Sequence, residues 1–179
     1  SPVWRIPLGA DACTRILQFW RETNDDGSLR WPLADPDLDT RFLGDIYQDL
    51  SEAAKKQYAL LQTPVFVEEF ILDQTLDPAI AEFGLSQVKM IDPACGSGHF
   101  LLGSFARLLD GWAGESPGLD VRERVQRALD QVHGVDVNPF AVAIARFRLT
   151  VAALRASGLK RLAEAPRYKY HVAAGDSLL

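Results

Sequence analysis

The sequence has 179 residues, of which 47% are hydrophobic and 24% are charged, so it can fold as a globular domain with a core of its own. It contains no apolar run of about 18 or more residues, which excludes a membrane-spanning helix, and we expect no membrane partner. The net charge of −5 gives no indication of the basic surface that a protein needs to bind DNA phosphates. Either the chain binds no nucleic acid, or the parts that grip DNA phosphates lie elsewhere in a longer protein.

Residues 1–57 are predicted to form a helical N-terminal segment. Residues 11–21 have the periodicity of a helix, and a turn is expected at residues 23–28. The tryptophans of this segment are open to two interpretations, a stacking platform for bases or packing in a core or interface, and packing is the commoner use. These tryptophans are Trp4, Trp20 and Trp31.

A second helical pattern over residues 39–61 leads to a Thr-Pro pair. Asp45 and Asp49 share one face of this pattern, and we interpret them as a solvated surface rather than a metal pair, so no metal site is expected. Thr63 suits the N-cap of a following helix, and Pro64 suits its first position. The residues alone leave open whether this pair is a plain helix start or a functional motif.

A glycine-rich turn follows the first predicted strand, residues 88–91. The turn and the start of the next helical pattern comprise Asp92, Pro93, Ala94, Cys95, Gly96, Ser97, Gly98, His99 and Phe100. Glycines at 96 and 98 suit a backbone that approaches a ligand closely or takes positive φ, and the free N–H groups of the next helix attract polar or anionic groups. With Cys13 and Cys95 as its two cysteines, the chain has no disulfide framework, which favours a reduced, cytoplasmic setting.

A second predicted strand also ends in an acid. The residues at its end are Asp136, Val137 and Asn138. An acid at this place in a doubly wound sheet can accept hydrogen bonds from both hydroxyls of a ribose. The interval of 44 residues from Asp92 exceeds the usual interval of about 20 because a helix predicted at residues 119–131 intervenes. The Asn-Pro pair starts a further helix, whose buried stripe is predicted to be Phe140, Ile144, Phe147, Val151 and Leu154.

A third strand, predicted at residues 168–172, leads to Asp176 and Ser177. Gly-Asp-Ser is also a common plain turn, so a structural turn and a ligand-facing acid both remain open, and the place after a strand favours the second.

Strands and helices therefore alternate, and each strand ends in a polar turn. This pattern predicts an α/β fold with a Rossmann-like doubly wound sheet, partial and of about three strands, over residues 58–179. Ligands of such sheets bind at the carboxyl ends of the strands. The three carboxylates of Asp92, Asp136 and Asp176 suit a cationic ligand with hydroxyl groups, and no arginine is placed for a dinucleotide phosphate.

The amino-acid sequences of these turns resemble motifs of the DNA amino-methyltransferases. Residues 92–100, Asp-Pro-Ala-Cys-Gly-Ser-Gly-His-Phe, are similar to motif I of that family, whose members bind S-adenosyl-L-methionine. The Thr-Pro pair, 28 residues before Asp92, is similar to motif X, although Gln62 stands where the family usually has a tyrosine. Gly-Val-Asp-Val-Asn-Pro at residues 134–139 is similar to motif II, and Asp176 to the acid of motif III.

The resemblance implies S-adenosyl-L-methionine as the cofactor and assigns roles to the acids. Asp92 would meet the methionine ammonium directly or through water, Asp136 the ribose, and Asp176 the adenine amino group. The Thr-Pro segment would close over the methionine end. The implied cofactor-binding residues are Thr63, Pro64, Asp92, Pro93, Ala94, Cys95, Gly96, Gly98, His99, Phe100, Asp136, Val137, Asn138, Asp176 and Ser177.

The order of the motifs, X before I, II and III, resembles the adenine-N6 methyltransferases. The sequences of the motifs are most similar to those of the large enzymes of the phage growth limitation (BREX type 2) defence systems. This implies double-stranded DNA as the partner of the full-length enzyme, with other defence-system proteins as further candidates.

The family's catalytic Asn-Pro-Pro-Tyr motif does not occur in the sequence. We therefore name no catalytic residue and expect the chain to be an inactive fragment on its own. An incomplete sheet also predicts an unpaired edge and an exposed apolar surface, and therefore self-association or poor stability. Two alternatives remain, a cofactor-sensing or subunit-docking module without catalysis and a methyltransferase that acts on protein or RNA.

Overall fold

The computed structural model describes residues 9–31, 40, 43 and 63–178. The chain divides into two compact units, Ser1–Leu38 and Asp39–Leu179, which are treated separately below. Several sequence predictions lie outside the described residues. They concern the boundary between residues 57 and 58, most of the helical pattern over residues 39–61, and the side chains of Trp4, Asp45, Asp49 and Gln62.

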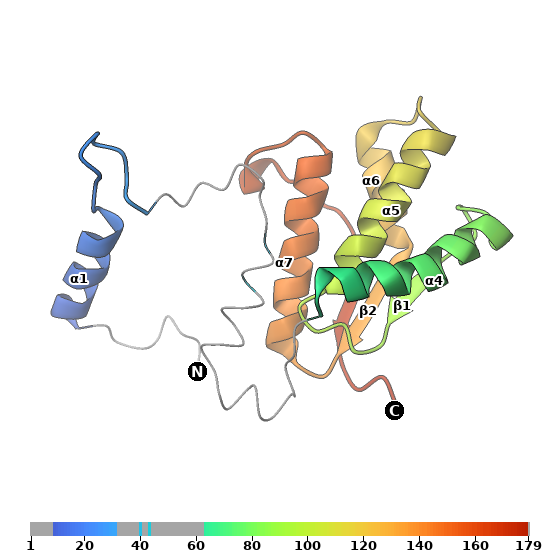
Figure 1. Cartoon of the computed structure of the whole chain (residues 1–179), viewed down its shortest axis with the longest axis horizontal. Helices are drawn as coiled ribbons and strands as arrows, with labels where there is room; N and C mark the ends of the chain where they lie inside the picture. The colour runs from blue at the N-terminus through green and yellow to red at the C-terminus, as the bar shows by residue number, and fades with distance from the viewer. Residues whose placement is uncertain (1–8, 32–39, 41–42, 44–62, 179) are drawn as a thin grey trace. The chain divides into compact units, whose positions relative to one another are not determined.

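The first unit contains helix α1, Ala10–Trp20, followed by a turn (Figure 1). An isolated antiparallel bridge joins Thr23 to Leu29, so the predicted helix and the predicted turn are both confirmed. Phe19 stacks on Trp31 with ring centroids 5.3 Å apart. A helix of 11 residues and a turn are too small to enclose a core, and the tryptophans lie on the surface of this unit, each 41% exposed: Trp20 and Trp31.

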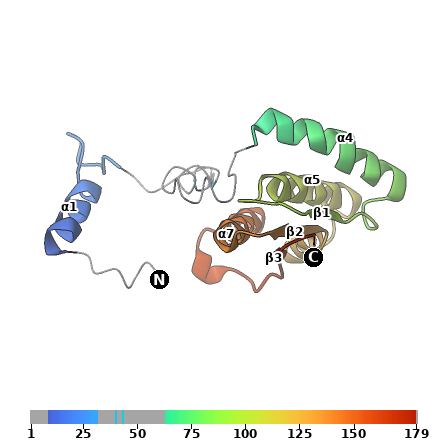
Figure 2. The ribbon, with the colours of Figure 1, turned by 90° about the horizontal axis from the view of Figure 1, so that it is seen from below.

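The second unit alternates helices and strands around a three-stranded sheet (Figures 1 and 2). Its elements are α4 (Val65–Phe83), β1 (Met90–Asp92), α5 (His99–Glu115), α6 (Val121–Asp130), β2 (Val132–Asp136), α7 (Pro139–Ala156), the 3-10 helix η2 (Leu162–Glu164) and β3 (His171–Ala174). The predicted helix at residues 119–131 corresponds to α6. The strands run parallel in the order β1-β2-β3. The prediction of an α/β fold with a Rossmann-like sheet of about three strands is therefore confirmed.

Helices α5 and α7 pack on one face of this sheet. Val132 and Val172 point toward that face and are 1% and 2% exposed. Gly134 lies on the same face, and a Cβ built on it would come within 2.9 Å of Leu101 in α5. The alternate residues point the other way, and Ile91 there is 64% exposed. The exposed face agrees with the apolar surface that we expect, while self-association itself remains a prediction.

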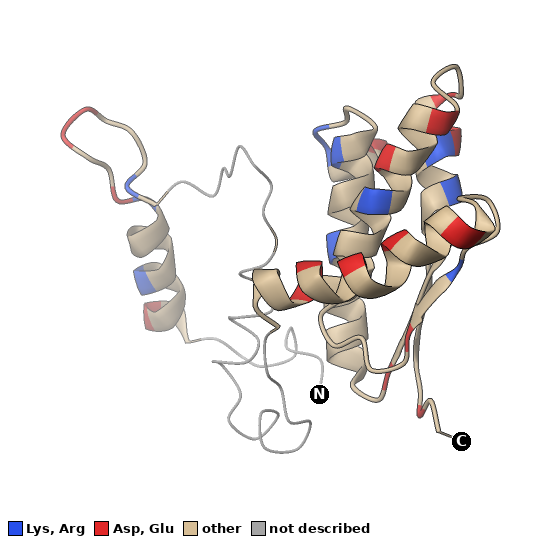
Figure 3. Cartoon of the chain, turned by 45° about the vertical axis from the view of Figure 1, so that its right-hand side comes forward, with Lys and Arg blue, Asp and Glu red and all other residues tan. Residues whose placement is uncertain are grey.

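Helix α4 is held against α5 by an ionic contact. Arg107 of α5 donates to the Asp73 carboxylate at 2.7 Å and also to Asp77. Between these helices and the sheet lies the main core, with Leu72 and Leu76 contributed by α4. Helix α4 carries acidic and no basic residues, whereas α5 and α6 carry both (Figure 3). Among the described residues, no helix is both long enough and apolar enough to cross a membrane.

Candidate functional site

The glycine-rich turn lies at the carboxyl end of β1 and leads into α5. Asp92, the last residue of the strand, accepts a hydrogen bond from the Ala94 N–H at 3.0 Å, which bends the chain out of the sheet. Gly96 and Gly98 have φ of 52° and 87°, in the region that favours glycine. Gly98 is the N-cap of α5, and a Cβ on it would meet the Ala145 side chain at 3.0 Å. Both predicted glycine positions are thus required by the backbone.

Asp136, at the end of β2, holds the two neighbouring turns together. Its Oδ2 accepts from the Gly96 N–H at 2.7 Å, and its Oδ1 accepts from the Asn138 N–H at 2.8 Å. The Cys95 N–H also donates to the Val135 carbonyl at 3.0 Å. The structure therefore brings together two segments that lie 40 residues apart in the sequence.

The acids of these turns create a local negative field. Burial raises the pKa of Asp92 above its ordinary value, the bond from Ala94 lowers it, and the charge of Asp136 raises it further. Burial, with the charges of Asp92 and Asp136, raises the pKa of the Cys95 thiol to about 12. Cys95 is only 5% exposed, so it packs as a small protonated residue and is unsuited to act as a nucleophile.

The start of α7 is organised by Asn138, as its sequence predicts. The Asn138 side chain accepts from the N–H groups of Phe140 and Ala141, at 3.0 and 3.4 Å, and it is fully buried. Val137 and Phe140 flank it and remain 58% and 66% exposed. The predicted buried stripe of this helix is therefore wrong at Phe140 and also at Phe147, which is 42% exposed. Helix α7 packs instead through small and branched residues that allow close approach: Ala141, Val142, Ala145, Leu149 and Ala153.

The third acid is held more loosely. Gly175 donates its N–H to the Asp136 carbonyl at 2.9 Å, so the end of β3 lies next to the end of β2. Asp176 accepts from the Leu178 N–H at 2.9 Å, and both Asp176 and Ser177 are exposed. The Asp176 carboxylate thus belongs to the same edge of the sheet without being fixed by another element in the described residues.

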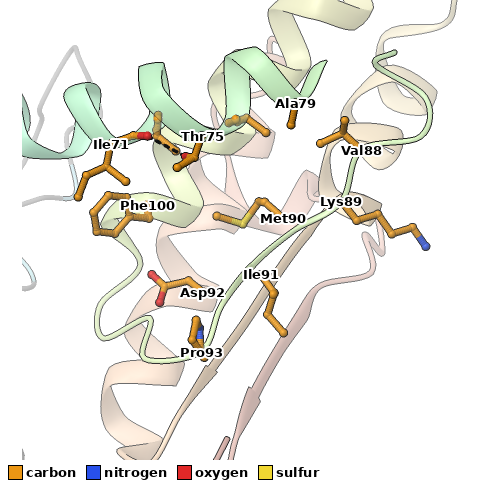
Figure 4. A pocket seen from close by; sticks show the side chains of 12 residues that line it. Ile71, Thr75, Ala79, Val88, Lys89, Met90, Ile91, Asp92, Pro93 and Phe100 are labelled. Carbon is orange, nitrogen blue, oxygen red and sulfur yellow. Dashed lines mark hydrogen bonds between the residues drawn. The ribbon is translucent and has the colours of Figure 1, made fainter. Parts of the chain in front are cut away.

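A cavity of about 490 Å³ lies between α4 and the outer edge of β1 (Figure 4). Asp92 and Pro93 of the turn and Phe100 of α5 line it, together with apolar residues of α4. Figure 4 shows the Asp92 carboxylate and the Phe100 ring on the side that faces α4. His99, beside Phe100, begins α5 and is 7% exposed.

The Thr-Pro pair lies at the start of α4, with one difference from the prediction. The helix begins at Val65, and Pro64 rather than Thr63 takes the N-cap position. The Pro64 carbonyl accepts from the N–H groups of Val67 and Glu68, at 3.0 and 3.1 Å, and no side chain caps the helix. Proline can occupy this position because an N-cap acts here through its carbonyl, which needs no N–H of its own.

Comparison with known proteins shows which families contain sequences similar to this chain. The profile described as MmeI, DNA-methyltransferase domain, matches residues 79–166. The adenine-specific methyltransferase PglX of Streptomyces coelicolor is 56% identical over 188 residues, which cover 100% of this chain and 16% of PglX. A putative type II restriction enzyme and methyltransferase of Methanocaldococcus jannaschii is 31% identical over 104 residues, which cover 53% of this chain and 9% of that protein.

Two solved structures share the fold. The DrdV–DNA complex has a TM-score of 0.59 at 17% identity, covering 82% of this chain and 14% of that one. The type IIL restriction-modification enzyme MmeI, in complex with DNA, has a TM-score of 0.58 at 22% identity, covering 86% of this chain and 24% of that one. The chain spans less than a fifth of the length of its curated relatives. With 56% identity to PglX along its whole length, the chain belongs to the same family as this adenine-specific methyltransferase.

Proposed function

We propose that this chain is the S-adenosyl-L-methionine-binding part of a DNA adenine-N6 methyltransferase that acts in phage defence or restriction–modification. The observation that carries the proposal is the Asp136 carboxylate, which joins the glycine turn to the start of α7 through Gly96 and Asn138. A turn held in this way presents backbone groups and a carboxylate to one ligand. The family membership supports the choice of ligand.

The residues of the turn fit this cofactor. Asp92 and Asp136 lie close enough to raise the pKa of Asp92, and no basic side chain of the described residues forms an ion pair with either acid. A ligand ammonium would supply the missing positive charge. Asp136 has about four lone-pair positions, two of which accept from backbone N–H groups, so the others can accept from ribose hydroxyls.

The exposed apolar side chains beside Asp136 suit the flat adenine ring. Val137 and Phe140 present 58% and 66% of their surfaces there. The sequence motifs pointed to Val137 and not to Phe140, although an aromatic residue directly after an Asn-Pro helix start was the available signal. Asp176 lies at the same sheet edge and would accept from the adenine amino group. In the complete enzyme the cofactor would supply a methyl group to adenine N6.

We propose that methyl transfer needs residues besides those of this chain. The sequence has no Asn-Pro-Pro-Tyr motif, which in the resembling family holds the amino group of a flipped adenine. Double-stranded DNA is then the partner of the longer enzyme, with other defence-system proteins as further candidates. The residues of this chain bind and orient the cofactor and supply no covalent nucleophile.

Calorimetric titration with S-adenosyl-L-methionine tests the proposal. We expect the chain to bind the cofactor, Asp136→Ala to abolish measurable binding, and Asp110→Ala, which removes an exposed acid of α5, to bind normally. A well-folded chain that shows no binding would contradict cofactor binding by this chain alone. A chain extended through an Asn-Pro-Pro-Tyr motif, assayed for methyl transfer to DNA, tests the activity, and binding without transfer there would favour a cofactor-sensing module.

A further inference from the structure

A buried arginine of α7 also contacts the glycine turn. Arg148 is 2% exposed. Its Nη1 donates to the Ser97 carbonyl at 2.8 Å and to the Ser97 hydroxyl at 3.3 Å, and its Nε donates to the Thr40 hydroxyl at 3.3 Å. The guanidinium thus joins α7 to residues that lie 51 and 108 positions away in the sequence.

Burial of this side chain is costly unless the guanidinium is well bonded. A charged group loses its hydration when it is buried, and an apolar residue at position 148 would pack at lower cost. Arginine offers five N–H donors in a rigid, planar arrangement, so one side chain can bond two separate segments at once. The contacts of Arg148 with Ser97 and Thr40 use this property.

Arg148 bonds the part of the site whose sequence restricts the backbone least. Ser97 stands between Gly96 and Gly98, which place few restrictions on the backbone. Asp136 fixes the N–H of Gly96, and Arg148 fixes the carbonyl of the next residue. Side chains of opposite charge, from two different elements, therefore hold consecutive residues of the turn.

We propose that Arg148 is a positioning residue for the ligand-binding turn and that it couples this turn to the segment at Thr40. The part of this inference that concerns the cofactor rests on the proposed function. Arg148 acts on the cofactor through Ser97, whose carbonyl it orients. A change at Thr40, which precedes α4, reaches the turn through the same guanidinium.

Hydrogen exchange of the free chain tests the positioning role without any cofactor. We expect Arg148→Gln to speed exchange of the amides at residues 97–101 roughly tenfold, because the turn loses a charge-assisted bond. Thr40→Val should speed it by a smaller factor of about two, since one of the bonds to Arg148 is lost. Arg146→Gln, at an exposed position of the same helix, is the matched control and should leave exchange unchanged.

Binding of two ligands gives a second readout that a purely structural role would not produce. Under the proposed function the turn meets the methionine half of the cofactor, while Asp136 and Val137 meet the nucleoside. Arg148→Gln should therefore weaken the affinity for S-adenosyl-L-methionine at least about tenfold. The same variant should change the affinity for adenosine by less than about twofold. Equal weakening of both ligands would overturn the positioning role.

The remaining outcomes are also decisive. Faster exchange spread evenly over α5, β2 and the turn would show that Arg148 serves general stability, and would overturn the inference. If Arg148→Gln fails to fold, Arg148→Lys replaces it, because lysine keeps the charge but cannot span Ser97 and Thr40 with its single ammonium. Wild-type behaviour of that variant would overturn the inference. If the wild-type chain binds no cofactor, the proposed function fails while the exchange experiment still decides the role of Arg148.

Discussion

The turns after β1 and β3 have the same kind of sequence and differ in how they are held. Each has an acid near the strand end, followed by small or polar residues. The first turn is bonded by Asp136 of β2 and by Arg148 of α7. The second turn is bonded to the Asp136 carbonyl through Gly175, and Asp176 otherwise bonds only locally, to Leu178, in the described residues.

The difference follows from what each turn leads to. The first turn enters α5, which packs so closely on α7 that Gly98 lies against Ala145. Cys95 and Gly98 of this turn are consequently buried, whereas Pro93 and Ala94 remain exposed. The second turn, residues 174–178, is exposed along its length. The same acidic signal therefore marks a turn held by the side chains of two other elements in one place and a turn held through a single backbone N–H in the other.

The largest expected contrast is in thiol reactivity. Cys95 of the first turn is buried and has its pKa raised to about 12, so only about one thiol in ten thousand is ionised at pH 8. We expect Ser177→Cys, in a chain with Cys13→Ser, to place a thiol in the exposed second turn that iodoacetamide alkylates at least about a thousandfold faster than Cys95. Mass spectrometry of both peptides measures the two rates. Comparable rates would show that the first turn opens readily.

Glycine substitutions give the next contrast, in stability. Gly98→Ala forces a residue with Cβ to adopt φ of 87° and places that Cβ 3.0 Å from Ala145. We expect the free energy of unfolding in urea to fall by about 1–3 kcal/mol. Gly175→Ala is the matched change in the second turn, where a Cβ would meet no atom within 4 Å, and it should cost less than about 0.5 kcal/mol. Similar losses for both variants would contradict the difference between the turns.

The sequence predicts the parts of the site that depend on local chemistry. The glycine positions, the acids at the strand ends and the Asn138 cap all follow from rules that act over a few residues. The structure has each of them where it is expected, with Asn138 fully buried and bonded to Phe140. The distance between Asp92 and Asp136 in the sequence is likewise explained by α6.

Contacts that depend on packing could not be predicted in this way. Periodicity places Phe140 in a buried stripe, yet it is 66% exposed because α7 approaches its neighbours through Ala141 and Ala145. Arg148 is not part of the predicted buried stripe, yet it is 2% exposed. Its partner Ser97 lies 51 residues away, and only the folded chain brings the two together.

The smallest expected contrast concerns Asp92, whose charge can lower the stability of the fold and still be needed to bind the ligand. The folded chain raises the pKa of Asp92, chiefly through burial, so the folded form holds this proton more tightly than the unfolded form. The resulting stability is present at low pH, below the unfolded pKa, and is lost as the pH rises through the folded pKa. Asp92→Asn keeps an acceptor for Ala94 and should remove this pH dependence.

At pH 7 we expect Asp92→Asn to raise the free energy of unfolding by less than about 1 kcal/mol, since the carboxylate is partly screened by solvent. Asp176→Asn, in the exposed second turn, is the control and should leave stability unchanged. Urea titrations at pH 4 and pH 7 measure both variants. If Asp92→Asn also weakens cofactor binding, the Asp92 carboxylate serves ligand binding and lowers the stability of the folded chain. A loss of stability in that variant at pH 7 would instead make Asp92 a structural acid, and the ammonium would need another partner.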